Sequence, residues 1–231
     1  MGYIFAFDGT DGSGKESQAK ALEENLRARG FHVRRLSFPM YAKPSSDLAQ
    51  AYLQGKFGTD PNSVSPYAAS TLYAVDRFAT LKTDWEKDYS NPNTILIMDR
   101  YTGSNAIHQG AKMATLAERR AFFAWLDNFE HDLMGIPRPN VVAYLDVLIS
   151  TTAQLMQERV NKFTLKSEKD IHERNQSYLQ KSRETGLQAV DYFDNWHKIT
   201  CVTEDGTMRT IEDIATSVLE LFDTTYQEGQ A

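Results

Sequence analysis

The 231-residue sequence contains a single cysteine, Cys201, and fewer basic than acidic side chains. One thiol excludes an internal disulfide and is typical of proteins from a reducing compartment. The net charge of −6 argues against a general nucleic-acid-binding scaffold, which needs a basic surface. We therefore expect a cytoplasmic protein with no nucleic-acid partner, in which any basic site is local and built from selected lysines and arginines.

Long apolar runs are also missing from the sequence. No stretch approaches the roughly 20 apolar residues that span a bilayer, so we expect no membrane anchor. The first apolar segment begins at Tyr3, which leaves no room for a signal peptide. Internal repeats and low-complexity linkers are absent too. The length and the 41% hydrophobic content suit one domain over residues 1–231.

The most informative motif present is the glycine-rich run from Gly9 to Lys15. It follows an apolar strand pattern and precedes a helical pattern, which is the context of a phosphate-binding P-loop. Glycines let the backbone N–H groups wrap around phosphates, and the helix N-terminus and Lys15 add positive charge. The residues that we expect to contact a bound nucleotide here are Gly9, Thr10, Asp11, Gly12, Ser13, Gly14, Lys15, Glu16 and Ser17.

Glu16 occupies the position where P-loops usually carry a serine or threonine that contacts Mg²⁺. Ser17 follows it but is rotated by about 100° around the helix, so it is a poor substitute. We interpret Glu16 as a solvated acid in the first helical turn, where negative charge is favourable. Magnesium is then expected to be held by phosphates, water and a carboxylate from elsewhere in the chain.

Five apolar segments are predicted to be strands, and helical patterns separate them. This alternation predicts an α/β protein: a three-layer α/β/α P-loop NTPase fold with a central parallel sheet of about five strands. The predicted strands are Tyr3–Asp8, Val33–Phe38, Thr94–Asp99, Val141–Asp146 and His197–Val202.

Two helical patterns carry further predictions. An apolar stripe at helical spacing is predicted to lie in the core or to extend to a dimer interface. Its members are Leu116, Phe122, Phe123, Leu126, Phe129 and Leu133. Thr210 to Asp213 is interpreted as a capping box that opens the final helix.

Sites in open α/β sheets lie beyond the carboxyl ends of the strands, which brings Asp99 and Arg100 next to the P-loop. An Asp at this place binds magnesium or its water, and a guanidinium forks onto phosphate oxygens. We predict Asp99 as the metal ligand and Arg100 as a phosphate ligand. A purely structural ion pair between the two is the alternative.

The segment at about residues 158–173 is rich in basic residues, and it follows the fourth predicted strand. A basic segment at this place is able to close as a lid, exclude water and neutralise developing charge. Arg159 is the preferred catalytic donor of the lid, with Lys162 and Lys166 beside the nucleotide. A solvated charged face remains the alternative reading.

Together, several segments resemble the thymidylate kinase family of P-loop nucleoside monophosphate kinases, and the resemblance covers nearly the whole chain. The Asp-Arg-Tyr-x-x-Ser-Asn stretch is its most specific part, because a P-loop alone indicates only a superfamily. The segments are Phe7–Lys15, Phe38–Tyr41, Ser70–Arg77, Asp99–Asn105 with Gln109, and Gly135–Pro139.

The resemblance implies ATP-dependent, Mg²⁺-assisted phosphorylation of dTMP to dTDP by a homodimer. It assigns thymine stacking to Phe38 or Tyr73, contacts with the base edges to Arg77 and Asn105, and packing on the sugar and phosphate to Tyr41. Arg100 holds the acceptor phosphate in this assignment, and Asp11 orients the sugar through its 3′-hydroxyl. Ser104 belongs to the same substrate site.

Two positions depart from the family pattern. His108 replaces a tyrosine that crowds the sugar 2′ position, which leaves discrimination between deoxyribose and ribose open; a helix-surface histidine away from the substrate is the alternative. In the lid, Asp170 and His172 replace an acidic and aromatic pattern and are expected to contact the acceptor. A kinase of another nucleotide such as dUMP, or a P-loop binding module without catalysis, remain the competing functions.

Overall fold

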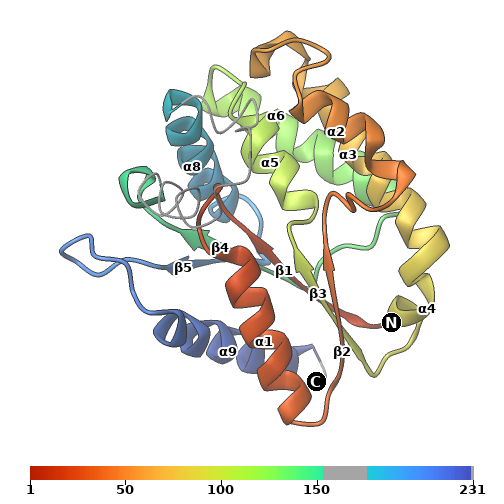
Figure 1. The fold of residues 1–231 in the computed structure, drawn as a ribbon, viewed down its shortest axis with the longest axis vertical. Coiled ribbons are helices and arrows are strands. Elements are labelled where there is room, and N and C mark those ends of the chain that lie inside the picture. Colours follow the sequence, from red (N-terminus) through yellow and green to blue (C-terminus); the bar gives the residue numbers. More distant parts are fainter. Residues whose placement is uncertain (153–175, 230–231) are drawn as a thin grey trace.

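The computed structural model describes residues 1–152 and 176–229, and within them one parallel sheet forms the centre of the molecule (Figure 1). Its five strands are all parallel, as the sequence predicts, and they follow the order β2-β3-β1-β4-β5. The strands are β1 (Tyr3–Asp8), β2 (His32–Ser37), β3 (Thr94–Asp99), β4 (Val141–Asp146) and β5 (Trp196–Thr200).

The three inner strands have the predicted bounds, whereas both edge strands begin and end earlier than predicted. β2 pairs with β3 from His32 onward, so the neighbouring strand sets its length. At the other edge the ladder ends at Thr200, and the chain beyond it turns back so that Val202 bridges to Met208. Cys201 therefore lies just after β5 and not within it, which corrects the prediction.

The central strand β1 is buried on both faces, as its uninterrupted apolar sequence predicts. Because successive side chains in a strand point to opposite faces, β1 contributes to two separate cores. Ile4 and Ala6 belong to one core, and Tyr3, Phe5 and Phe7 belong to the other.

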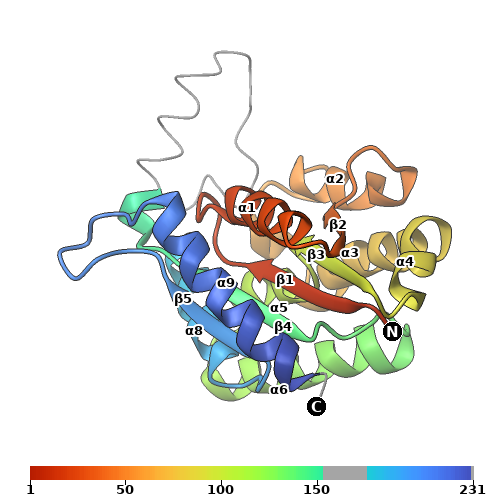
Figure 2. The same cartoon turned by 90° about the horizontal axis from the view of Figure 1, so that it is seen from below.

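Helices cover both faces of the sheet, which makes the three predicted layers (Figures 1 and 2). The pair α1 (Lys15–Ala28) and α9 (Ile211–Glu228) packs on one core, where Leu26 and Phe222 are fully buried. The other core lies under α3 (Pro66–Thr80), α5 (Thr102–Gly110), α6 (Leu116–Asp127) and α8 (Gln176–Val190). Of two short helices, α2 (Asp47–Leu53) packs against α3 and α4 (Glu86–Ser90) packs against β3.

The apolar stripe on α6 is only partly core. Its central aromatic residues are buried and Leu116 and Leu133 are exposed, so the core holds only the middle of the stripe, and an interface at its ends stays a prediction. After α6 the chain forms a π-helical segment, Asn128–Leu133, whose wider turn shifts the helical register. In this segment the charged Glu130 is fully buried, whereas Leu133 faces solvent.

The N-terminus of α9 shows half of the predicted capping box. The Thr210 hydroxyl accepts a hydrogen bond from the Asp213 N–H at 3.1 Å. The reciprocal bond is absent among the described residues, since an aspartate is one methylene shorter than the glutamate that usually closes the box. The full capping box lies at the start of α6, between Thr115 and Glu118.

Two further observations concern the length of the helices and the single cysteine. Within residues 1–152 and 176–229, no helix combines the length and the apolar character that crossing a bilayer requires. Cys201 is fully buried, and burial raises the pKa of its thiol to about 12. A thiol with so high a pKa is an unreactive core residue.

The strand order places the functional site. β1 lies between β3 and β4, and the chain continues from β1 toward one edge and later returns to the other. Ligand sites in such sheets lie at this switch point, beyond the carboxyl ends of the strands. The P-loop follows β1, and the Asp99-Arg100 pair ends β3 beside it.

Candidate active site

The loop between β1 and α1 requires its glycines. Gly9, Gly12 and Gly14 have φ angles of 153°, 77° and 87°, which residues with a side chain rarely adopt. A Cβ atom at Gly9 would also lie 2.8 Å from both the Leu145 carbonyl oxygen and the Ser13 Oγ. Only glycine fits this close approach, so the loop has the tight path expected of a P-loop.

The start of α1 offers unpaired N–H groups to an anion. Its first hydrogen bond runs from the Gln18 N–H to the Gly14 carbonyl at 3.0 Å, so the preceding N–H groups have no partner within the helix. These groups and the helix dipole make the N-terminus a favourable place for phosphate. The Thr10 hydroxyl, buried and without a partner in the described residues, adds a further polar group beside them.

Lys15 lies across the loop with its ammonium group buried. It donates to the Gly9 carbonyl at 3.1 Å, to the Thr10 carbonyl at 2.7 Å and to the Ser13 Oγ at 3.2 Å. Burial, together with the nearby Arg100, lowers the pKa of Lys15 to about 8. A bound phosphate at this place restores the charged form, because an anion next to the ammonium raises its pKa.

A small pocket opens at the mouth of the loop, and it contains the predicted metal ligand Asp99. Gly12, Gly14, Lys15, Glu16 and Arg100 complete its lining. The carboxylate oxygens of Asp99 suit Mg²⁺, which binds through one or two carboxylates together with substrate phosphates. In agreement with such a sparse site, the described ranges 1–152 and 176–229 contain no cluster of three His, Cys, Asp or Glu.

Glu16 and Ser17, on the first turn of α1, line two different pockets. Glu16 lines the pocket at the loop mouth and is otherwise exposed to solvent. Ser17 lines a groove between α1 and α9, together with Ile211 and Leu219. The structure therefore brings Glu16, but not Ser17, to the P-loop pocket.

Arg100 connects the P-loop to the end of β3. Its backbone has a φ of 65°, which is uncommon for a residue with a long side chain, and its N–H donates to the Phe7 carbonyl at 3.0 Å. The guanidinium forms an ion pair with Asp11. Burial alone would lower the pKa of Arg100, but Asp11, Asp99 and Asp8 raise it, so the side chain is a permanent cation.

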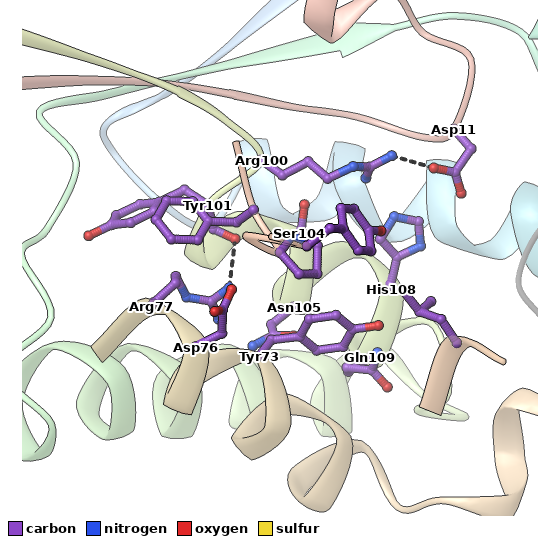
Figure 3. A pocket seen from close by; sticks show the side chains of 14 residues that line it. Asp11, Tyr73, Asp76, Arg77, Arg100, Tyr101, Ser104, Asn105, His108 and Gln109 are labelled. Atoms are coloured by element: carbon purple, nitrogen blue, oxygen red, sulfur yellow. Dashed lines mark hydrogen bonds and ion pairs between the residues drawn. The ribbon is translucent and has the colours of Figure 1, made fainter. Parts of the chain in front are cut away.

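All eight substrate residues predicted within the described ranges line one pocket, here called the main pocket (Figure 3). It adjoins the P-loop, because Asp11 belongs to both. The eight residues are Phe38, Tyr41, Tyr73, Arg77, Arg100, Ser104, Asn105 and His108.

Aromatic residues form the walls of the main pocket. Phe38 is almost fully buried, and its ring is held by Tyr101 at a centroid distance of 5.8 Å and by Trp85 at 6.4 Å. Tyr41 is 61% exposed, so its ring is accessible at the pocket entrance. Tyr73 lies opposite on α3 and points into the pocket (Figure 3).

Arg77 and Asn105 lie together at the floor of the main pocket and share one partner, Glu130. Arg77 donates from Nε and Nη2 to the two oxygens of the Glu130 carboxylate, at 2.8 and 2.6 Å. The Asn105 Nδ2 donates to the same carboxylate at 2.8 Å and to the Ser70 carbonyl at 3.2 Å. The arrangement fixes both side chains before any ligand binds.

His108 lines the main pocket as a neutral imidazole. Burial, helped by the cations Arg100 and Lys15, lowers its pKa to about 4. Its ring is nearly parallel to that of Tyr178 on α8, at a centroid distance of 6.4 Å. The alternative of a surface histidine away from the substrate site is excluded, since only 8% of His108 is exposed.

Two site carboxylates were missed by the sequence predictions. Asp8 is fully buried below the P-loop, accepts a hydrogen bond from Ser104, and has its pKa raised by burial to about 6. Asp76 accepts from the Met40 N–H at 2.8 Å and from the Ser45 hydroxyl at 2.6 Å, which holds the loop beyond Phe38. Their signals were an acid directly before Gly9 and an acid directly before Arg77.

Five predicted site residues cannot be compared with the structure. Residues 153–175 are outside the described ranges, and the predicted lid at 158–173 falls within them. The residues concerned are Arg159, Lys162, Lys166, Asp170 and His172.

Comparison with known proteins places this geometry in a family. A model of the thymidylate kinase family matches residues 7–214. Thymidylate kinase of Mycobacterium tuberculosis is 33% identical over 157 residues, which cover 68% of this chain and 69% of the relative. A probable thymidylate kinase of Methanosphaera stadtmanae is 28% identical over 199 residues, or 86% of this chain and 89% of the relative.

The fold is also found among solved structures. Thymidylate kinase from Candida albicans superposes with a TM-score of 0.69 over 97% of this chain and 92% of that chain, at 19% identity. This likeness supports the α/β/α P-loop fold predicted from the sequence, and the family match covers the P-loop, the main pocket and β4. The chain therefore belongs to the thymidylate kinase family.

Proposed function

We propose that the protein transfers the γ-phosphoryl group of ATP to dTMP and thereby forms ADP and dTDP. Family membership supports this activity. The structural observation that carries the proposal is the junction of two sites at Asp11 and Arg100. The P-loop pocket and the main pocket meet there, so a donor and an acceptor phosphate are brought side by side.

On the donor side, Lys15 and the N–H groups at the start of α1 hold the phosphates of ATP. The ammonium group exchanges the Gly9 and Thr10 carbonyls for phosphate oxygens, which bear more negative charge. Asp99 would hold Mg²⁺, which supplies positive charge to the phosphates when it is bound. Because Lys15 is buried, its interaction with phosphate is stronger than the same contact in water.

On the acceptor side, the main pocket orients dTMP along its length. Arg77 and Asn105 contact the base edge at the floor, and Phe38 or Tyr73 stacks on the base. Arg100 holds the acceptor phosphate near the P-loop, and Asp11 accepts a hydrogen bond from the sugar 3′-hydroxyl. Each role uses the hydrogen-bonding capacity of the side chain concerned.

The reaction needs alignment and charge more than covalent chemistry by the protein. An oxygen of the dTMP phosphate forms a bond to the γ-phosphorus of ATP, while the bond from that phosphorus to the bridging oxygen breaks and ADP leaves. Lys15 and Arg100 are permanent or readily charged cations on either side of the transferred group. Their positive charge stabilises the charge that develops in the transition state.

An ADP-release assay with ATP and Mg²⁺ tests this function, with dTMP, dUMP, UMP and dCMP as acceptors. The proposal predicts the highest kcat/KM for dTMP and ADP formation equal to dTDP formation. Preference for a different acceptor would keep the phosphotransfer and change the substrate. Binding of ATP and dTMP without turnover would indicate a nucleotide-binding module and contradict the proposal.

Two further proposals concern the assembly and the location of the protein. We propose a homodimer through the outer face of α3, where Tyr67, Val75 and Phe78 are exposed apolar side chains. Analytical ultracentrifugation of the wild type and of Val75→Glu tests it, since a charge within the interface favours monomers. The single buried thiol is compatible with a reducing compartment, which supports the cytoplasm as the proposed location.

A further inference from the structure

Glu130 is a fully buried carboxylate at the floor of the main pocket, although it does not line the pocket itself. It belongs to the π-helical segment Asn128–Leu133 that follows α6. Such wide turns are frequent at functional sites. Its two oxygens accept three hydrogen bonds, two from Arg77 and one from Asn105. A single acid therefore determines how both of these side chains present themselves to a ligand.

The contacts of Asn105 settle which end of its amide faces the pocket. A carboxylate and a backbone carbonyl only accept hydrogen bonds, so both the Glu130 and the Ser70 contacts require the NH₂ group. Two acceptors use both of its hydrogens. The Asn105 Oδ1 accepts no hydrogen bond from the described residues and is left to accept one from a ligand.

Arg77 offers hydrogen-bond donors to the pocket, whereas Asn105 offers an acceptor. Its guanidinium has five N–H groups, of which three are used by the Glu130 carboxylate and, at 3.4 Å, by the Tyr101 carbonyl. The remaining N–H groups at Nη1 and Nη2 are donors for a ligand. Arg77 and Asn105 lie on the same side of the main pocket, opposite Arg100 (Figure 3).

Glu130 also compensates the charge of Arg77. The two side chains are 2% and 0% exposed, so they form a neutral pair in the protein interior. The floor therefore attracts a polar neutral group, whereas Arg100 at the other end, whose pairing with Asp11 a phosphate is able to replace or join, attracts a phosphate. This difference orients a nucleotide with its base down and its phosphate toward the P-loop.

We propose that Glu130 is a positioning residue that selects the base: it makes the floor offer donors from Arg77 and an acceptor from Asn105. This inference rests on the proposed function. The pattern matches a pyrimidine with a hydrogen on N3 and a carbonyl at C4, as in thymine and uracil. Cytosine has an unprotonated N3 and an amino group at C4, so it meets acceptor with acceptor and donor with donor.

Equilibrium binding of dTMP, dUMP and dCMP without ATP tests the inference, in the wild type and in Glu130→Gln. The glutamine keeps the size of the side chain but offers an NH₂ group in place of one acceptor oxygen. We expect the wild type to bind dCMP at least about 100-fold more weakly than dTMP, because mismatched buried polar groups are strongly rejected. In Glu130→Gln we expect at least about tenfold weaker dTMP binding and at least about tenfold less discrimination against dCMP.

Two internal controls separate positioning from general damage. The ratio of dTMP to dUMP binding should stay constant within about twofold, because Glu130 does not contact the position of the thymine methyl group. The core variant Phe222→Leu, on the opposite face of the sheet, should lower stability without changing any of the three affinities. In turnover, Glu130→Gln should raise KM for dTMP more than it lowers kcat, and KM for ATP should remain unchanged.

If Glu130→Gln does not fold, Glu130→Asp replaces it, since it keeps the charge on a side chain that is one methylene shorter. The preference for dTMP over dCMP should then fall by a smaller factor than the one expected for Glu130→Gln. Unchanged dTMP-to-dCMP discrimination in the folded variant would overturn the inference, as would equal losses in ATP and dTMP binding. Because the affinities are measured without ATP, this result does not depend on turnover. Absent turnover in the wild type would contradict the proposed function alone.

Discussion

The guanidinium of Arg100 and the carboxylate of Asp11 form an ion pair that joins the end of β3 to the P-loop (Figure 3). The pair lies where the two proposed phosphate sites meet. In the absence of nucleotide, Asp11 takes the place of an anion beside Arg100, and the cation is already held in position. A ligand phosphate then replaces or joins a contact that exists, without a long search by a flexible side chain.

The guanidinium of Arg100 is planar and carries paired N–H donors, so we predict that a lysine cannot replace it. Arg100→Lys keeps the charge but loses the planar, two-point grip on phosphate oxygens. We expect KM for dTMP to rise by at least about tenfold, with a smaller change in KM for ATP, measured by steady-state kinetics. Arg138→Lys is a matched control, because Arg138 pairs with Asp127 and Asp132 at the surface. Equal KM values for dTMP in Arg100→Lys and in the wild type would contradict the assignment.

Lys15 is predicted to be indispensable for turnover. Lys15→Met preserves the volume of the aliphatic side chain and removes the charge that faces the β- and γ-phosphates. We expect kcat to fall by at least about 1,000-fold, measured by ADP release. Lys20→Met, on the exposed side of the same helix, removes a surface pair with Glu24 and should retain full activity. A kcat near that of the wild type in Lys15→Met would exclude the P-loop assignment.

The Arg77–Glu130 pair predicts a large stability difference between buried and exposed ion pairs. Arg77→Met leaves the Glu130 charge buried without its partner, which costs about 3–5 kcal/mol of unfolding free energy. Arg138→Met removes exposed pairs and should cost about 0–1 kcal/mol. Urea denaturation of both variants measures the difference. A loss below about 1 kcal/mol in Arg77→Met would mean that the pair is not desolvated.

The pKa shifts of Asp8 and His108 should make the free energy of unfolding depend on pH in opposite directions. Folding lowers the pKa of His108 from 6.5 to about 4, so the unfolded state binds more protons between these values and stability rises with pH there. Folding raises the pKa of Asp8 from 3.8 to about 6, so the folded state binds more protons and stability falls with pH in nearly the same window. Each effect is at most about 3 kcal/mol, and the two oppose each other.

Single variants should separate the two contributions. Relative to the wild type, His108→Gln should lose stability as the pH rises from 4 to 6.5, because the wild type sheds the low-pH penalty of its neutral histidine and the variant has no such penalty to shed. Asp8→Asn should gain stability relative to the wild type as the pH rises from 4 to 6. Urea denaturation at half-unit pH steps measures both differences. Parallel curves for a variant and the wild type would show that the residue does not titrate as stated.

The sequence predicts the sheet and most of the pocket for an identifiable reason. Parallel strands end at the same edge, so residues that follow β1, β2 and β3 meet in space, as Asp11, Phe38 and Arg100 do. Edge-strand bounds were less accurate, because β5 ends where the chain turns back at Val202 and not where its apolar pattern stops.

Glu130 shows what sequence patterns do not reveal. It lies four residues after Leu126, on the apolar face of the helix, where a charged side chain is unusual. Its charge is compensated by a guanidinium 53 positions away in the chain. Neither the local helical pattern nor the family motifs contain this information, so only the three-dimensional structure identifies it.

The burial of Cys201 makes the chain its own reporter of ligand binding. A thiol reagent reaches this residue only after the core beneath α9 opens, and no other thiol competes with it. A nucleotide bound at the P-loop stabilises the closed state and therefore slows labelling in proportion to its affinity. The rate of thiol modification thus ranks ligands of this protein directly, without a coupled enzyme and without turnover.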